Sequence, residues 1–176
     1  RVGLQHVRQS PRLRAILLRV FLFFFQAIAL QALLPLLAKR YGAGAGGYTL
    51  LLASLGSGAV VAALGVSLLR ERYTRDQIVR GGTVIQAVMT VLAALSPSLA
   101  WTLPALVIAG MAWISTANTL TMSAQLAVPN WVRARGMAVY QMALMGGNAV
   151  GAAFWGQVAG MTDVPTSLIA AAVVGV

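Results

Sequence analysis

The side chains best suited to bind a small molecule lie within an apolar stretch, residues 103–128. They recur at spacings of four, three, four and three residues: Met111, Ser115, Asn118, Met122 and Gln125. Because this spacing follows the helical repeat, the five residues share one face of an α-helix. Amides and thioethers on such a face could contact a bulky amphipathic substrate. Hydrogen bonding between helices explains the same pattern equally well.

Other polar side chains also interrupt apolar stretches. Gln141 and Asn148 stand seven residues apart on one helix face, and Gln26 lies in the first apolar stretch. The residues that we expect to contribute to a substrate pathway are Gln26, Ser115, Asn118, Met122, Gln125, Gln141 and Asn148.

Two glycine pairs repeat the small-xxx-small spacing of closely packed membrane helices. They are Gly147 with Gly151 and Gly156 with Gly160. The spacing indicates helix packing more than function, because it lets two backbones approach each other.

Residue counts argue against an enzyme. The acids are Glu71, Asp76 and Asp163, the one histidine is His6 in the leading segment, and there is no cysteine. Neither a metal cluster nor a catalytic triad can be assembled from these, and no cofactor is expected. His6 is expected to be a solvated loop residue. If the protein couples to protons, its carboxylate lies outside this chain, because no acid occurs in the middle of an apolar stretch.

The composition is that of a membrane protein. Of the 176 residues, 59% are hydrophobic and 9% are charged, and the mean hydropathy is +0.82. A soluble core of this size could not hide so much apolar surface. The sequence predicts an all-α, polytopic membrane bundle with helices at 11–38, 48–69, 78–96, 103–128, 136–161 and 164–176, the last of them partial.

Basic residues indicate how these helices are oriented. Eleven arginines fall on one side of the alternating spans, and Lys39 and Arg40 fall on the other. Because cytoplasmic loops carry the excess of Lys and Arg, we place the N-terminal end in the cytoplasm. Arg19, inside the first helix, is expected to snorkel to the headgroups. The net charge of +10 is then explained by orientation, and no nucleic acid is expected as a partner.

Two stretches carry a family resemblance. Residues 6–14 read His-Val-Arg-Gln-Ser-Pro-Arg-Leu-Arg, and in residues 129–142 a Pro-x-Trp-x-Arg-x-Arg-Gly loop enters a Tyr-Gln helix. On these motifs the whole chain, 1–176, resembles the C-terminal six-helix half of a major facilitator superfamily transporter. The similar branch contains enterobactin-type siderophore exporters and related bacterial efflux permeases. Since the chain begins at Arg1 and residues 170–176 stop within an apolar run, we expect a fragment. The resemblance implies that the N-terminal half is absent from it.

The superfamily's cytoplasmic signature loop is matched in part, by Gly65, Arg70, Arg72 and Arg75. Leu69 stands where the motif has an aspartate, which weakens the expectation of a charge-relay latch. Arg70 and Arg72 are expected to bridge to neighbouring helix ends.

The resemblance implies a twelve-helix protein whose halves rock around a central site. We therefore expect a secondary active exporter of siderophore-like or drug-like small molecules in the bacterial inner membrane. Its partners would be the substrate, the lipid bilayer and the missing N-terminal six-helix half. The first, second, fourth and fifth spans are expected to approach the cavity. An importer of an unknown solute and a transport-inactive scaffold or sensor on the same fold remain the alternatives.

Overall fold

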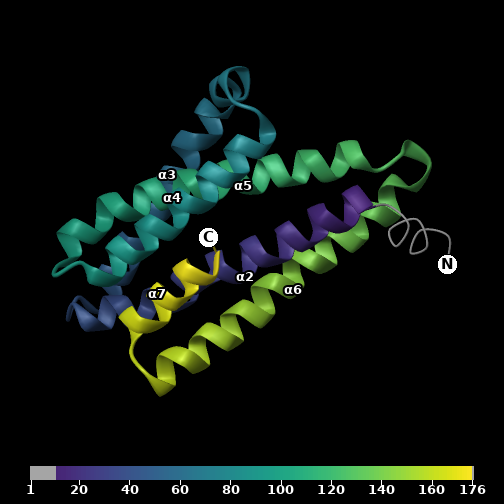
Figure 1. Ribbon diagram of the computed structural model, residues 1–176. Helices are drawn as coiled ribbons and strands as arrows, with labels where there is room; N and C mark the ends of the chain where they lie inside the picture. The colour runs from purple at the N-terminus through teal and green to yellow at the C-terminus, as the bar shows by residue number, and fades with distance from the viewer. Residues whose placement is uncertain (1–10, 176) are drawn as a thin grey trace.

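The computed structural model describes residues 11–175, which form an all-helical bundle (Figure 1). The α-helices are α2 (Pro11–Arg40), α3 (Gly44–Arg72), α4 (Arg75–Leu95), α5 (Leu99–Ala127), α6 (Arg133–Met161) and α7 (Val164–Gly175), and a 3-10 helix, η1 (Asn130–Val132), precedes α6. Each predicted helix range overlaps one of these α-helices. His6 lies outside the described residues.

Two connections are shorter than the sequence suggested. The second helix was expected to begin at residue 48, but α3 already begins at Gly44. Among residues 11–175, only Gly42 and Gly44 have positive φ angles, 65° and 56°, the conformation that favours glycine. The segment expected between the helices at 48–69 and 78–96 is also largely helical. The structure starts α4 at Arg75, where Thr74 and Gln77 form a capping box.

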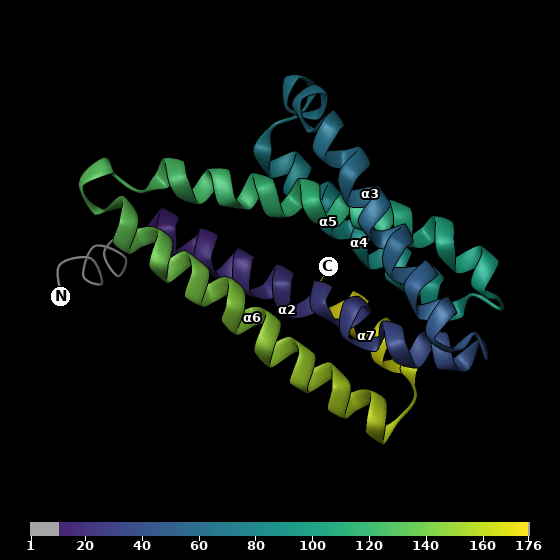
Figure 2. The ribbon, with the colours of Figure 1, turned by 180° about the vertical axis from the view of Figure 1, so that it is seen from behind.

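The helices form two related groups of three. In the first group, α3 and α4 both pack against α5. In the second group, α6 and α7 both pack against α2. Exchanging α2 with α5, α3 with α6 and α4 with α7 therefore maps these pairings onto one another. Figures 1 and 2 show α2 between α5 and α6, with α7 running back along α2. α7 is shorter than its counterpart α4, at 12 residues against 21.

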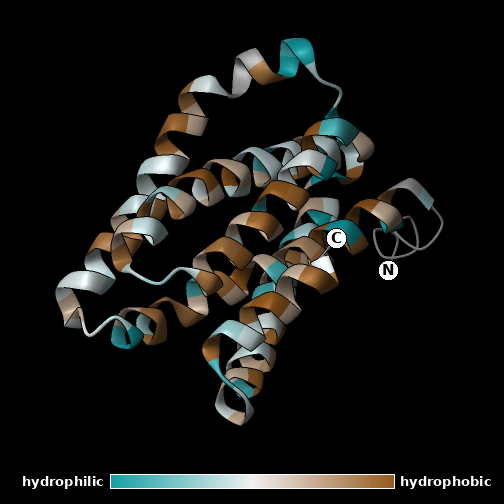
Figure 3. Ribbon diagram, turned by 60° about the vertical axis from the view of Figure 1, so that its left-hand side comes forward, coloured by the Kyte–Doolittle hydropathy of each residue, from teal (hydrophilic) through white to brown (hydrophobic). Residues whose placement is uncertain are grey.

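Four helical stretches are long and apolar enough to cross a membrane: Leu13–Arg40, Gly44–Gly65, Arg75–Leu95 and Leu99–Ala127. Large hydrophobic side chains remain exposed on the bundle surface, and Leu64 on α3 is 81% exposed. Lipid is the solvent that suits such a surface. Figure 3 shows hydrophobic residues along the helices and hydrophilic ones at several helix ends. For α6 and α7, membrane crossing stays a prediction.

Polar contacts join α2 to the first turn and to the last turn of α4. Arg19 Nη1 lies 2.8 Å from Asp76 Oδ1. At the other end, Arg40 Nη1 donates a 2.8 Å hydrogen bond to the Ala94 carbonyl oxygen. The helix from Arg19 to Arg40 is about 30 Å long, the thickness of the hydrocarbon core. The two contacts therefore lie near the two edges of the hydrocarbon core if α2 spans the membrane.

These contacts refine two expectations about charge. Arg19 was expected to snorkel to the headgroups, but its guanidinium is held by an aspartate on another helix. Lys39 and Arg40 were the exception to the charge distribution. Arg40 sits at the C-terminal end of α4, where the helix dipole favours a cation.

Candidate functional site

The polar stripe of α5 is accessible along most of its length. Met122 and Gln125 are exposed, and Met111 and Asn118 are partly exposed. Ser115 differs, because only 7% of it is exposed and it lies among the buried residues of the bundle. Ser115 lies at the edge of the stripe, on the side of α5 that packs against other helices. The structure thus leaves four of the five residues on one open face of the helix.

The hydrogen bonds of α5 separate two kinds of polar residue. Thr119, Thr121 and Ser123 each donate to the carbonyl oxygen four residues earlier in α5. In contrast, the amides of Asn118 and Gln125 have no hydrogen-bond partner among the described residues. Hydrogen bonding between helices was the alternative explanation of the stripe. Within residues 11–175 these two amides form no such bond.

A hydrogen bond joins α5 to α6 beside this face. The hydroxyls of Thr121 and Tyr140 lie 2.8 Å apart, and Tyr140 is 1% exposed. Their chain neighbours Met122 and Gln141 are both exposed. Neither Thr121 nor Tyr140 was singled out from the sequence, since a hydroxyl pair on two helices has no spacing signature.

Of the two candidates on α6, Gln141 is exposed and Asn148 is partly exposed. Neither amide forms a hydrogen bond with another described residue. They therefore resemble Asn118 and Gln125 in having free hydrogen-bonding capacity. The uncharged face of α5 and the two amides of α6 can each offer hydrogen bonds to a ligand, and the methionines of α5 can offer adaptable apolar contacts.

Gln26 lies elsewhere. It is 2% exposed, and neither its amide nitrogen nor its amide oxygen has a hydrogen-bond partner among the described residues. Its side chain packs against Gly175 of α7, where a Cβ atom would collide with it. In this conformation Gln26 points into the bundle and does not reach the accessible face of α5.

The glycine pairs behave differently from each other. A Cβ atom on Gly147 would lie 2.7 Å from the Phe21 carbonyl oxygen, and one on Gly151 would lie 2.6 Å from Ile28 Cγ2. These two glycines therefore let α6 lie against the α2 backbone, as predicted. Among the described residues, no atom lies within 4 Å of a Cβ position on Gly156 or Gly160. These two glycines make no close helix contact in this part of the chain, and the packing interpretation stays a prediction for them.

A second close approach joins α3 to α5. A Cβ atom on Gly58 would collide with the Val107 carbonyl, and one on Gly110 with the Leu55 carbonyl. These contacts were missed because each glycine stands on a different helix, so no spacing along the chain marks the pair.

The signature-loop candidates lie at the end of α3 and the start of α4. Gly65 is partly exposed, and Arg70, Arg72 and Arg75 are exposed. None of these three arginines forms an ion pair within residues 11–175. The ion pairs instead belong to Asp76, which contacts Arg80 at 2.9 Å as well as Arg19. The expected bridges from Arg70 and Arg72 to other helix ends are absent from this part of the chain.

The long apolar helices and the uncharged face define a multi-pass membrane protein. A family model described as Transmembrane secretion effector matches residues 1–175, and the chain belongs to this major facilitator-type family of membrane transporters. No curated protein matches the chain. The family match confirms the coarse prediction of a transporter and the expectation that the chain is not an enzyme.

Proposed function

We propose that this chain is the C-terminal six-helix half of a twelve-helix secondary active exporter, and that the accessible face of α5 and α6 lines its substrate pathway. The family description names secretion, which favours export over uptake. In the proposed protein, an N-terminal half in the same bacterial inner membrane completes the cavity, and the two halves rock around it. The N-terminal end of the chain faces the cytoplasm.

The proposal rests on four amide side chains and on their accessibility and hydrogen bonding. Asn118, Gln125, Gln141 and Asn148 are accessible and have no hydrogen-bond partner among the described residues. A polar group facing hydrocarbon without a partner costs several kcal/mol. These amides are therefore better accommodated by water and substrate in a central cavity than by lipid.

The chemistry of this face suits an amphipathic substrate. Met111 and Met122 offer flexible apolar contact surface, and the amides beside them can donate and accept hydrogen bonds. A siderophore-like or drug-like compound, as in the enterobactin-type exporter branch, combines these two requirements. Gln26 and Ser115 contribute only after a rearrangement, because both are buried in this conformation.

An accumulation assay tests the proposal. Cells expressing the full-length gene receive a panel of labelled siderophores and lipophilic drugs, with and without a protonophore. We expect one compound to be depleted in a protonophore-sensitive way, and Asn118→Ala to weaken that depletion. Ser123→Ala is the matched control, since its hydroxyl bonds to its own helix. Increased uptake would favour an importer, and no change for any compound despite membrane expression would favour a scaffold or sensor.

A further inference from the structure

Three arginines lie close together in the chain where α3 connects to α4. Arg70 and Arg72 belong to the last turn of α3, and Arg75 is the first residue of α4. All three are exposed, and none forms an ion pair or a side-chain hydrogen bond within residues 11–175. They border an open hollow of about 610 Å³. These three residues are called the arginine cluster below.

The hollow is positively charged. Glu71 is the one acid among its described lining residues, so its three arginines and one glutamate carry a net charge of +2. Asp76 does not compete for the cluster, because it contacts Arg19 and Arg80 instead. A guanidinium can donate two parallel hydrogen bonds to a phosphate or a carboxylate. The cluster is therefore equipped to bind an anion.

The cluster lies at the depth of the lipid phosphates. The candidate span on α3 ends at Gly65, and the one on α4 begins at Arg75 itself. Arg70 and Arg72 follow Gly65 by five and seven residues, about 8–11 Å along the helix. The headgroup region on each side of the hydrocarbon core is about 5–8 Å thick. Because a long arginine side chain can extend back toward the headgroups, its guanidinium can reach a lipid phosphate.

An exposed apolar surface on α3 leads to the cluster. Val61 is 52% exposed and Leu64 is 81% exposed. Arg72 follows Val61 by eleven residues, close to three helical turns, so the two lie on one face of α3. This face offers apolar contacts within the hydrocarbon core and a guanidinium beyond it. A phospholipid matches both parts, whereas a soluble anion or a carboxylate on another helix would use only the charged part.

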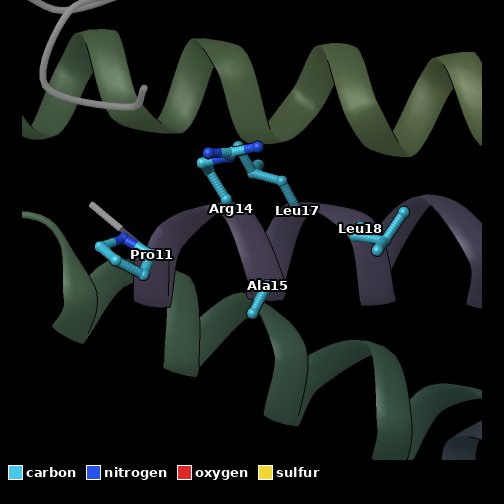
Figure 4. A pocket seen from close by; sticks show the side chains of 5 residues that line it. All are labelled: Pro11, Arg14, Ala15, Leu17 and Leu18. Atoms are coloured by element: carbon cyan, nitrogen blue, oxygen red, sulfur yellow. The ribbon is translucent and has the colours of Figure 1, made fainter. Parts of the chain in front are cut away.

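A hollow at the start of α2 provides a contrast. Its volume is the same, about 610 Å³. Figure 4 shows that the guanidinium of Arg14 extends there from α2 toward α6. The other described lining residues are apolar: Pro11, Ala15, Leu17 and Leu18. One cation beside apolar side chains gives a weaker preference for an anionic headgroup than three cations do.

We propose that the arginine cluster binds the phosphate headgroup of an anionic phospholipid, whose acyl chains lie along Val61 and Leu64 of α3. Each arginine beside an anionic headgroup strengthens binding about fivefold. The inference uses the membrane insertion of α3 and does not depend on transport. Its test therefore measures lipid binding, so that its failure would leave the proposed exporter untouched.

Native mass spectrometry of the full-length protein in detergent tests the proposal, because it resolves each bound lipid. The protein is titrated with phosphatidylglycerol, which is anionic, and with phosphatidylcholine, which is zwitterionic. Arg72→Gln is compared with Arg80→Gln. Both variants remove one exposed positive charge, but the Arg80 guanidinium is already paired with Asp76 at 2.9 Å. A third variant changes all three arginines of the cluster to Gln, and Arg72→Lys keeps the charge.

We expect the wild-type protein to bind phosphatidylglycerol more tightly than phosphatidylcholine. Arg72→Gln should weaken phosphatidylglycerol binding about fivefold and the triple variant about 100-fold. Arg80→Gln and Arg72→Lys should have smaller effects than Arg72→Gln. Equal affinity for the two lipids, or an unchanged affinity in the triple variant, would overturn the proposal and leave carboxylates of another part of the protein as the partners of these arginines. Displacement of the lipid by an equal concentration of inorganic phosphate would also overturn it, because a free anion would then suffice.

Discussion

Arg19 Nη1 lies 2.8 Å from Asp76 Oδ1, although 57 residues separate them along the chain. Asp76 also contacts Arg80 at 2.9 Å, so one carboxylate is shared by two guanidinium groups. The Arg19 and Asp76 side chains are 53% and 46% exposed, which leaves room for solvent or headgroups around them. The contact fixes the start of α4 against the first turns of α2.

Replacing this shared carboxylate should have a small effect on stability. Asp76→Asn removes both ion pairs, but partly exposed pairs contribute about 0–1 kcal/mol each. We expect a slight fall in the thermal unfolding temperature of detergent-solubilised protein at low salt, and a smaller one at high salt, where charges are screened. Asp163→Asn is the control, because Asp163 forms no ion pair within the described residues. A loss of several kcal/mol would contradict this account.

The glycines of α6 should respond unequally to the same substitution. Gly151→Ala places a methyl group against the Phe25 carbonyl oxygen and Ile28, so α6 must move away from α2. Overpacking of this kind costs about 1–3 kcal/mol. Gly156→Ala places its methyl group more than 4 Å from every other described residue that could obstruct it and should be neutral or slightly stabilising. Unfolding measurements on the two variants compare them directly, and equal effects would refute the packing role of Gly151.

Arg40 should contribute more to stability than its neighbour Lys39. Arg40→Ala removes the 2.8 Å hydrogen bond to the Ala94 carbonyl oxygen at the end of α4. Cations at helix C-termini contribute about 0.3–1 kcal/mol. Lys39 has no hydrogen-bond or ion-pair partner among residues 11–175, so Lys39→Ala should be close to neutral. Two variants with indistinguishable unfolding temperatures would show that the contact is not stabilising.

The buried indole of Trp155 provides a further test of how α6 is held. Its Nε1 donates a 2.9 Å hydrogen bond to the Phe25 carbonyl oxygen, and Trp155 is 2% exposed. Trp155→Phe removes the donor and part of the ring, whereas Trp155→Ala removes the whole ring and should cost about 3–5 kcal/mol. We expect Phe to be tolerated better than Ala in unfolding measurements. The reverse order would mean that the ring is not part of the core.

Much of this fold could be predicted from residue patterns. The apolar runs located the helices, and the Gly147 and Gly151 spacing identified a real close contact, because both signals are local in the chain. The contacts of Arg19 and Arg40 could not be read in this way, since their partners Asp76 and Ala94 stand on another helix. For a membrane helix, the sequence shows that a charge is present but not what it pairs with.

The candidate site was predicted less completely. Periodicity placed Asn118, Met122 and Gln125 on one face, and the structure leaves that face open. Periodicity could not show that Ser115 and Gln26 are buried. The polarity of a residue does not indicate which side of its helix is covered by neighbouring helices. The Thr121 and Tyr140 pair could not be predicted, because the two hydroxyls stand on different helices and meet only in the fold.

The central claim is that the α5 face lines a water-filled pathway in the assembled protein. It is tested most directly by cysteine labelling at Asn118→Cys in cells expressing the full-length protein, with a water-soluble maleimide. Ser123→Cys is the control on another side of the same helix. We predict that position 118 reacts, that transported substrate protects it, and that position 123 reacts slowly. Equal reactivity at the two positions, or no reaction at position 118, would contradict the claim.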